Sequence, residues 1–279
     1  MIKNIIGGIA VGVANVIPGV SGGTMMVILG IFNRMMDAIS GVFKVDNKNR
    51  LSDIIFLLQV ALGVVVGLVG FAKILEYLFN YFPTQTMYWF IGLIAFSIPL
   101  FIKGEMKGEK KSMIWMILGM AVIFALQILN PGKDQTVVNP EFPALTLFLC
   151  IKMIFIGMIG GATMLMPGVS GSMVLLILGE YYLFKSYLAN VMTFSLDIII
   201  PLGFMGIGII LGILLSAKVC QYFLKRSKGQ FLSFILGLII ASSLVLIPFN
   251  VQYNLFVILT SIFAFVLGGI IVIGLGKIQ

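Results

Sequence analysis

Six long apolar stretches divide the chain, and each reaches or nearly reaches the length of a membrane-crossing helix. They cover residues 53–80, 86–103, 112–130, 196–224, 230–248 and 254–276. A helix needs about 20 apolar residues to cross roughly 30 Å of hydrocarbon. The pattern therefore predicts six transmembrane helices.

Two further apolar stretches, 4–40 and 145–190, are each interrupted by the same kind of phrase. The first contains Pro18-Gly19-Val20-Ser21-Gly22-Gly23, and the second contains Pro167-Gly168-Val169-Ser170-Gly171-Ser172. Proline and clustered glycines end a helix. Each interrupted stretch is therefore predicted to form two half-helices around a non-helical turn.

The second phrase belongs to a repeat of the first half of the chain. A shift of 149 positions superposes Gly8 on Gly157 together with the two phrases, and a shift of 145 superposes Gly63 on Gly208. Matches at such steady offsets indicate a tandem duplication. We expect a first repeat at 1–130, a polar linker at 131–144 outside the cytoplasm, and a second repeat at 145–279.

The distribution of basic residues predicts how the interrupted stretches lie in the membrane. If both turn back, one side of the membrane holds 12 of the 18 Lys and Arg residues, whereas the opposite loops hold Lys133 alone. Basic residues concentrate in cytoplasmic loops. The interrupted stretches are therefore predicted to be re-entrant hairpins, with both termini in the cytoplasm. Three crossings per repeat is an odd number, so the repeats are inverted relative to each other, which is typical of transporters.

Composition supports an all-α integral membrane protein and excludes several kinds of chemistry. Of the 279 residues, 60% are hydrophobic, 10% are charged and none is histidine. Without histidine, Ser-His-Asp catalysis and most transition-metal sites are excluded. Cys150 and Cys220 lie in apolar sequence without ligand spacing, so neither a metal nor a cofactor is expected. The net charge of +8 is attributed to basic residues of cytoplasmic loops that lie near anionic lipid headgroups. No nucleic-acid partner is expected. A cleaved signal peptide is not expected.

The two interrupting turns are the candidate binding site, because inverted hairpins can bring them together near the middle of the membrane. Free N–H groups that start the second half-helices, together with serine and threonine hydroxyls, suit an anion such as phosphate. The alternative is that these small residues only allow close helix packing. The candidate headgroup ligands are Asn15, Pro18, Gly19, Ser21, Gly22, Gly23, Thr24, Pro167, Gly168, Ser170, Gly171 and Ser172.

Charged residues inside apolar stretches are further candidates, because charge is costly in lipid. Lys73 and Lys218 occupy equivalent repeat positions and either guide an anionic headgroup or extend to the membrane surface. Arg34 and Lys185 lie near the mouths of the first and second hairpins. Glu180 follows the second phrase and is a candidate proton or partner site.

The phrases Asn15 to Thr24 and Met166 to Ser172 resemble those of the bacterial polyprenyl-phosphate transporter family, as do Asn33 to Ile39 and Leu178 to Tyr181. The resemblance covers essentially the whole chain. It implies a flippase of the bacterial cytoplasmic membrane that returns undecaprenyl phosphate, the lipid carrier of peptidoglycan and other wall polymers, to the cytoplasmic leaflet. The expected partners are this lipid phosphate and membrane lipids, and a homo-oligomer is left open.

Two other functions remain as alternatives. A small-anion transporter or channel would use the same turns but leaves a lipid-facing groove unexplained. An undecaprenyl-pyrophosphate phosphatase has a similar phrase that contains arginine, with acidic residues in the half-helix before it. Here glycine or serine takes that place, and residues 4–17 contain no acid. Because phosphoryl transfer needs such groups, no enzyme activity is expected.

Overall fold

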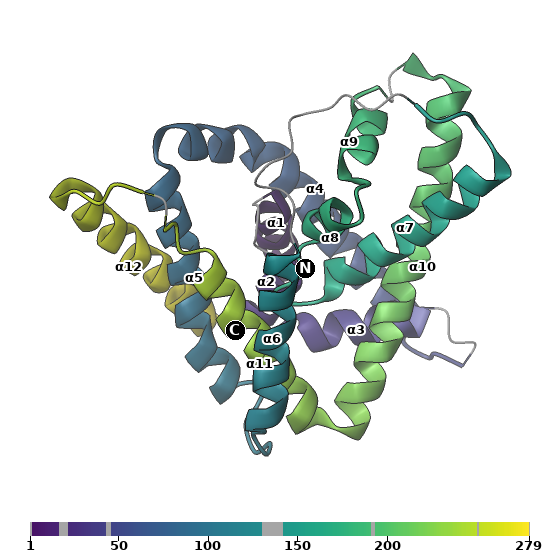
Figure 1. Ribbon diagram of the computed structural model, residues 1–279. Helices are drawn as coiled ribbons and strands as arrows, with labels where there is room; N and C mark the ends of the chain where they lie inside the picture. The colour runs from purple at the N-terminus through teal and green to yellow at the C-terminus, as the bar shows by residue number, and fades with distance from the viewer. Residues whose placement is uncertain are drawn as a thin grey trace.

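The computed structural model describes residues 2–16, 22–42, 46–129, 142–190, 193–249 and 251–278. Within these ranges the chain forms twelve α-helices and no strand, as the sequence predicted (Figure 1). The first half contains α1 (Ile2–Val16), α2 (Gly22–Ile28), α3 (Phe32–Val42), α4 (Arg50–Tyr81), α5 (Pro83–Lys103) and α6 (Met113–Ile128). The second half contains α7 (Leu147–Leu165), α8 (Gly171–Ile177), α9 (Tyr181–Ala189), α10 (Leu196–Arg226), α11 (Lys228–Val245) and α12 (Leu255–Ile278).

The helices of the two halves pack in matching pairs. Helix α1 lies along α4, and α7 lies along α10 in the same way. Helix α5 lies along α12 of the other half, and the corresponding α11 lies along α6 (Figure 1). Each helix pair of one half thus has a counterpart in the packing of the other half.

Glycines that match between the halves form the closest points of these pairs. A Cβ atom on Gly8 of α1 would lie 2.2 Å from the Val60 carbonyl oxygen of α4, and one on Gly157 of α7 would lie 2.2 Å from the Met205 oxygen of α10. Gly92 and Gly237 approach α12 and α6 equally closely. Small residues let apolar helices approach to backbone contact. The steady spacing of glycines in the sequence thus marks helix crossings.

Each interrupted stretch has two breaks, whereas the sequence predicted one. After α2 the chain turns at Gly30 (φ +62°), and α2 and α3 meet at a bend of 117°. The N–H groups of Gly30 and Ile31 bond to the carbonyl oxygens of Val27 and Met26, at 3.1 and 3.0 Å. This is a Schellman ending, in which glycine takes the left-handed position. The prediction of two half-helices was therefore wrong in this detail.

The second half ends α8 by the same geometry. Gly179 (φ +74°) and Glu180 donate to the carbonyl oxygens of Leu176 and Leu175, both at 2.9 Å. Each interrupted stretch is consequently a long helix, a seven-residue helix and a third short helix.

Six described helices are long and apolar enough to cross a membrane, which agrees in number with the sequence prediction but not in membership. They include α7, the first part of the second interrupted stretch. Helix α6 has only 16 residues and falls among the shorter apolar helices. At about 1.5 Å per residue it spans roughly 24 Å, less than a typical hydrocarbon core. The multi-pass character is confirmed, and the assignment of α6 as a full-length span is not.

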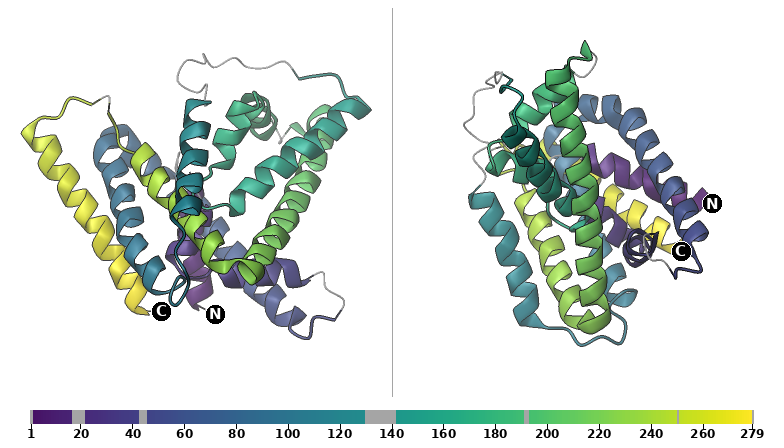
Figure 2. Two further views of the ribbon diagram at one scale, coloured as in Figure 1. Left: turned by 60° about the horizontal axis from the view of Figure 1, so that its bottom comes forward. Right: turned by 90° about the vertical axis from the view of Figure 1, so that its right-hand side faces the viewer.

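The two ends of the described chain lie on the same side of the molecule, here called the N/C side (Figure 2). Helix α1 starts on this side and runs toward the middle, whereas α7 starts on the opposite side and runs toward the middle. Helix α3 lies on the N/C side, and α9 lies on the opposite side. The interrupted stretches thus approach each other from opposite ends.

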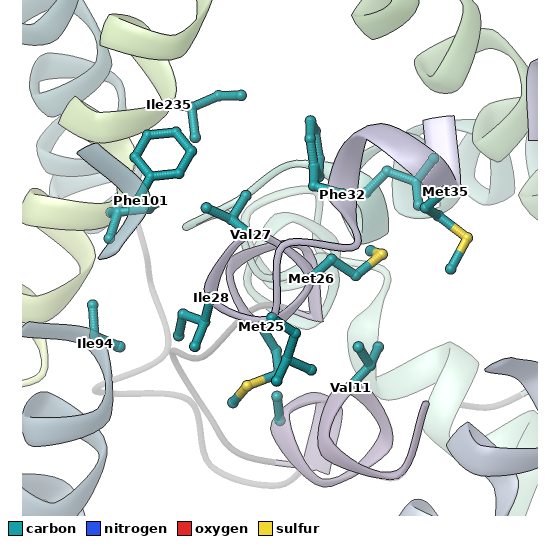
Figure 3. Close-up of a cluster of buried hydrophobic side chains, with 14 of the residues drawn as sticks. Val11, Met25, Met26, Val27, Ile28, Phe32, Met35, Ile94, Phe101 and Ile235 are labelled. Carbon is teal, nitrogen blue, oxygen red and sulfur yellow. The ribbon is translucent and has the colours of Figure 1, made fainter. Parts of the chain in front are cut away.

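Helix α2 occupies the centre of the core, and every one of its seven residues is buried. Met25 lies toward Val11 of α1, and Ile28 lies toward Ile94 of α5 (Figure 3). A helix that is apolar on all sides must be surrounded by other elements. This position places the start of α2, with Gly22 and Gly23 of the first interrupting phrase, deep inside the protein.

Candidate functional site

The start of α2, with Gly23 of the first interrupting phrase, meets the second interrupting phrase in the interior of the molecule. The hydroxyl oxygen of Thr24, at the start of α2, accepts a hydrogen bond of 2.7 Å from the backbone N–H of Gly168. These residues lie 144 positions apart in the chain. Thr24 is only 1% exposed, so the contact is sealed from the surroundings. The hydroxyl oxygen accepts this bond, which leaves the Thr24 proton to be donated to another acceptor.

One glycine of each phrase lies in close backbone contact with another element: Gly23 with the end of α7 and the second phrase, and Gly168 with α11. A Cβ on Gly23 would lie 2.7 Å from the carbonyl oxygen of Leu165 and 2.8 Å from the nitrogen of Pro167. Gly168 has φ +79°, and a Cβ there would lie 2.8 Å from the Leu238 carbonyl oxygen of α11. Any side chain at Gly23 would push the two interrupted stretches apart.

The other candidate headgroup ligands divide into those the structure describes and those it does not. Gly22 starts α2, Gly171 starts α8, and Ser170 is the buried N-cap residue of α8. Pro18, Gly19 and Ser21 lie outside the described residues, as do the side chains of Asn15, Ser172 and Lys73. Because α2 and α8 have only seven residues each, their dipoles add little, and hydroxyl and turn groups are the main candidate donors.

Arg34 is the best-defined polar centre among the predicted residues. Its guanidinium lies 2.5 Å from a carboxylate oxygen of Asp53 in α4 and 4.9 Å above the ring of Phe56. The Asp53 side chain is 6% exposed, whereas that of Arg34 is 42% exposed. Asn47 donates to the second carboxylate oxygen of Asp53 at 2.7 Å. Asp53 therefore fixes Arg34 while leaving part of the guanidinium open.

Two cavities border Arg34. The larger, of about 800 Å³, is also lined by Lys48 and by three carboxylates, those of Asp37, Asp46 and Asp53. The smaller, of about 320 Å³, includes Asn4 in its lining and contains no carboxylate. Arg34 thus lines both a cavity with three carboxylates and a cavity in which it is the only charged residue.

Glu180 forms an ion pair that the sequence analysis did not predict. Its carboxylate lies 2.6 Å from the ammonium of Lys152 in α7, and its side chain is 15% exposed. Lys152 is the only charged residue of α7, and a charge inside an apolar helix calls for a partner. That solitary lysine was the available signal. The Lys185 side chain lies outside the described set.

Lys218 is exposed on α10, between the buried Ala217 and Cys220. It belongs to neither of the centres described above. An exposed position on a lipid-length helix agrees with extension toward headgroups.

Helix α3 is tied to neighbouring elements by two more polar contacts that sequence reasoning missed. Asn33 donates to the carboxylate of Glu105, which follows α5, and Gln221 of α10 donates to Asp37 at 2.7 Å. Burial raises the pKa of Glu105, although Lys228 and the bond from Asn33 act in the opposite direction. The partners are 72 and 184 residues away, so no local spacing could reveal them.

These features define a class: a multi-pass helical membrane protein in which two interrupted helical stretches meet inside the molecule. A family model described as undecaprenyl phosphate translocase-like matches residues 11–273. The chain belongs to that family.

Two curated proteins are similar over much of the chain. A polyprenyl-phosphate transporter of Staphylococcus aureus is 30% identical over 80% of this chain and 78% of its own length. A polyprenyl-phosphate transporter of Vibrio cholerae is 26% identical over 67% of this chain and 55% of its own length. No solved structure matches the chain.

Proposed function

We propose that this protein is a transporter that returns undecaprenyl phosphate from the outer to the cytoplasmic leaflet of the bacterial plasma membrane. The observation that carries the proposal is the contact of Thr24 with Gly168, which joins two phrases far apart in the chain. Membership of the translocase-like family and the names of the two relatives give the substrate class.

In this proposal the two interrupted stretches are re-entrant hairpins of inverted repeats, with the N/C side in the cytoplasm. Opposite directions of α1 and α7 support the inversion (Figure 2). Irregular backbone at membrane depth is tolerated only inside protein or beside a water-filled cavity. The phosphate is held where the turns meet, by backbone amides and by the hydroxyls of Ser21, Thr24 and Ser170. The polyprenyl chain stays in lipid.

Transport of a labelled polyprenyl phosphate between the leaflets of proteoliposomes tests the proposal. We expect transport by the wild type and none by Gly23→Val, whose side chain would strike the backbone at Leu165. The matched control is Gly203→Val, because a Cβ at Gly203 meets nothing within 4 Å. Equal transport by both variants, each stably inserted, would remove the meeting of the turns from the mechanism.

A second assay separates transport from catalysis. The purified protein is expected to release no phosphate from undecaprenyl pyrophosphate, with or without Mg²⁺. Sustained turnover would replace the transporter proposal with a phosphatase. Transport of inorganic phosphate in place of the lipid would favour the small-anion alternative.

A further inference from the structure

The smaller cavity beside Arg34 has the composition of an anion site. It has a volume of about 320 Å³, and its polar lining comes from Asn4 of α1, Arg34 of α3, and Ser52 and Gln59 of α4. None of its lining residues is acidic. Ligand cavities range from about 300 to 1,000 Å³, so this one suits a headgroup rather than a whole lipid.

The contacts of Arg34 and Asn4 leave several hydrogen-bond donors of the cavity for a ligand. The bond from Arg34 to Asp53 uses one of the five N–H donors of a guanidinium. Asn4 donates to Gln59 at 2.7 Å, which leaves the amide of Gln59 as a further donor. A guanidinium with neighbouring amide donors is a typical partner of phosphate.

An exposed apolar stripe leads away from the cavity along α4. It consists of Ile55, which itself lines the cavity, followed by Leu58, Leu62 and Val65. Their exposed fractions lie between 46% and 64%. Residues 55 to 65 extend about 15 Å along a helix. A polar headgroup cavity continuous with a lipid-facing apolar stripe matches a phosphate that carries a hydrocarbon chain.

The second half of the protein has different residues at the corresponding positions, although its helices pack in the same pairs. The repeat offsets place Met153, Leu183 and Phe204 where the first half has Asn4, Arg34 and Gln59. Met153 and Leu183 are buried in one apolar cluster, and Phe204 packs against it. The same offsets place Glu180 and Asp197 at the positions of Ile31 and Ser52. The second half therefore has two carboxylates and no cation at these lining positions, a composition that does not suit an anion.

We propose that the Arg34 cavity is a second headgroup subsite, specific to the N/C side, that binds the phosphate monoester of a single-chain lipid after it leaves the central turns. This inference rests on the proposed function. The α4 stripe takes the first part of the hydrocarbon chain, and Asp53 keeps the guanidinium aimed at the cavity.

Alkylation of a single introduced cysteine gives a local readout. Ser52→Cys places a thiol in the cavity, and the native Cys150 and Cys220 are buried. Geranylgeranyl phosphate should slow this alkylation severalfold in detergent-solubilised protein. Geranylgeraniol and inorganic phosphate at the same concentration should not. Lys107→Cys, an exposed position that does not line the cavity, is the matched control and should react at the same rate in the presence of each ligand.

Filling the cavity should then weaken the protection. Asn4→Met combined with Gln59→Phe installs the residues of the second half and should raise the half-protecting concentration about ten- to a hundredfold, as expected for losing hydrogen bonds to a charged group. Arg34→Gln combined with Asp53→Asn should do the same without leaving a lone buried carboxylate.

The outcomes separate this subsite from the proposed function. Wild-type transport without protection of Ser52→Cys would overturn the subsite alone. Protection by inorganic phosphate would make it a small-anion site, and protection by geranylgeraniol would make it an apolar groove. Either result overturns the lipid-phosphate assignment. Absence of transport by the wild type, together with absence of protection in Ser52→Cys, would overturn both proposals.

Discussion

Replacing Thr24 by valine isolates the contact between the two interrupted stretches. Valine keeps the shape of threonine and removes the hydroxyl that accepts from the Gly168 N–H at 2.7 Å. Because Thr24 is only 1% exposed, no water can replace its hydroxyl, and the Gly168 N–H loses its partner. A buried donor left unpaired costs about 1–3 kcal/mol. This corresponds to roughly a 5- to 150-fold change in an equilibrium constant.

Thermal unfolding of the purified protein measures this loss, with Thr86→Val as the matched control. Thr86 is also buried, and its hydroxyl donates at 2.7 Å to the Phe82 carbonyl oxygen, which also accepts the Thr86 backbone N–H. Its removal leaves no group unpaired and should cost less than about 1 kcal/mol. Thr24→Ser, which keeps the hydroxyl, should fall between wild type and Thr24→Val. If Thr24→Val unfolds no earlier than Thr86→Val, the hydrogen bond does not hold the stretches together.

Three other predictions follow from the packing, the buried acid and the sidedness. Gly8→Ala should disrupt the α1–α4 crossing and lower the unfolding temperature, whereas Gly70→Ala, with nothing within 4 Å of its Cβ, should not. Glu105→Gln should raise the unfolding temperature at neutral pH. Because burial raises the folded-state pKa of Glu105, its buried charge is lost as pH falls through that value, and the advantage should vanish in acid; a constant difference would contradict this. Cysteines at Lys107 and Gln252 should be labelled from the cytoplasm and from outside, respectively; labelling of both from one side would refute the proposed topology.

Backbone features of the fold were predictable because they depend on local chemistry. Proline next to glycine removes a helix donor and admits turn conformations, so the breaks after α1 and α7 could be placed from the sequence. Repeated glycines at fixed offsets indicated the duplication, and they proved to be the helix crossings. Gly30 and Gly179 were not recognised as breaks, because a single glycine in an apolar run is compatible with a continuous helix. Only the capping bonds of the folded chain identify them as helix ends.

The polar partners were less predictable, because they depend on which helices become neighbours. Arg34 and Glu180 were singled out as charges in apolar sequence, but the positions of their partners were not. Asp53 and Lys152 lie on long helices whose rotation about their own axes is set by packing against α1 and α10. One residue of rotation changes the direction of a side chain by about 100°. Pairs such as these follow from tertiary geometry.

The two halves share a backbone plan but differ in the polar contacts of their third helices. On the N/C side, α3 is bonded through Asn33, Arg34 and Asp37 to three different elements. The offset places Leu183 and Ser186 of α9 at the positions of Arg34 and Asp37. A headgroup site that is present at just one end changes the relative populations of the states that face each side. Such binding cannot by itself drive net transport. It shifts the equilibrium between the two states only by the difference in the ligand's affinity for them. In the proposed mechanism, the two halves supply a matched pair of interrupted stretches, and the difference between their polar residues sets how strongly each end retains a headgroup.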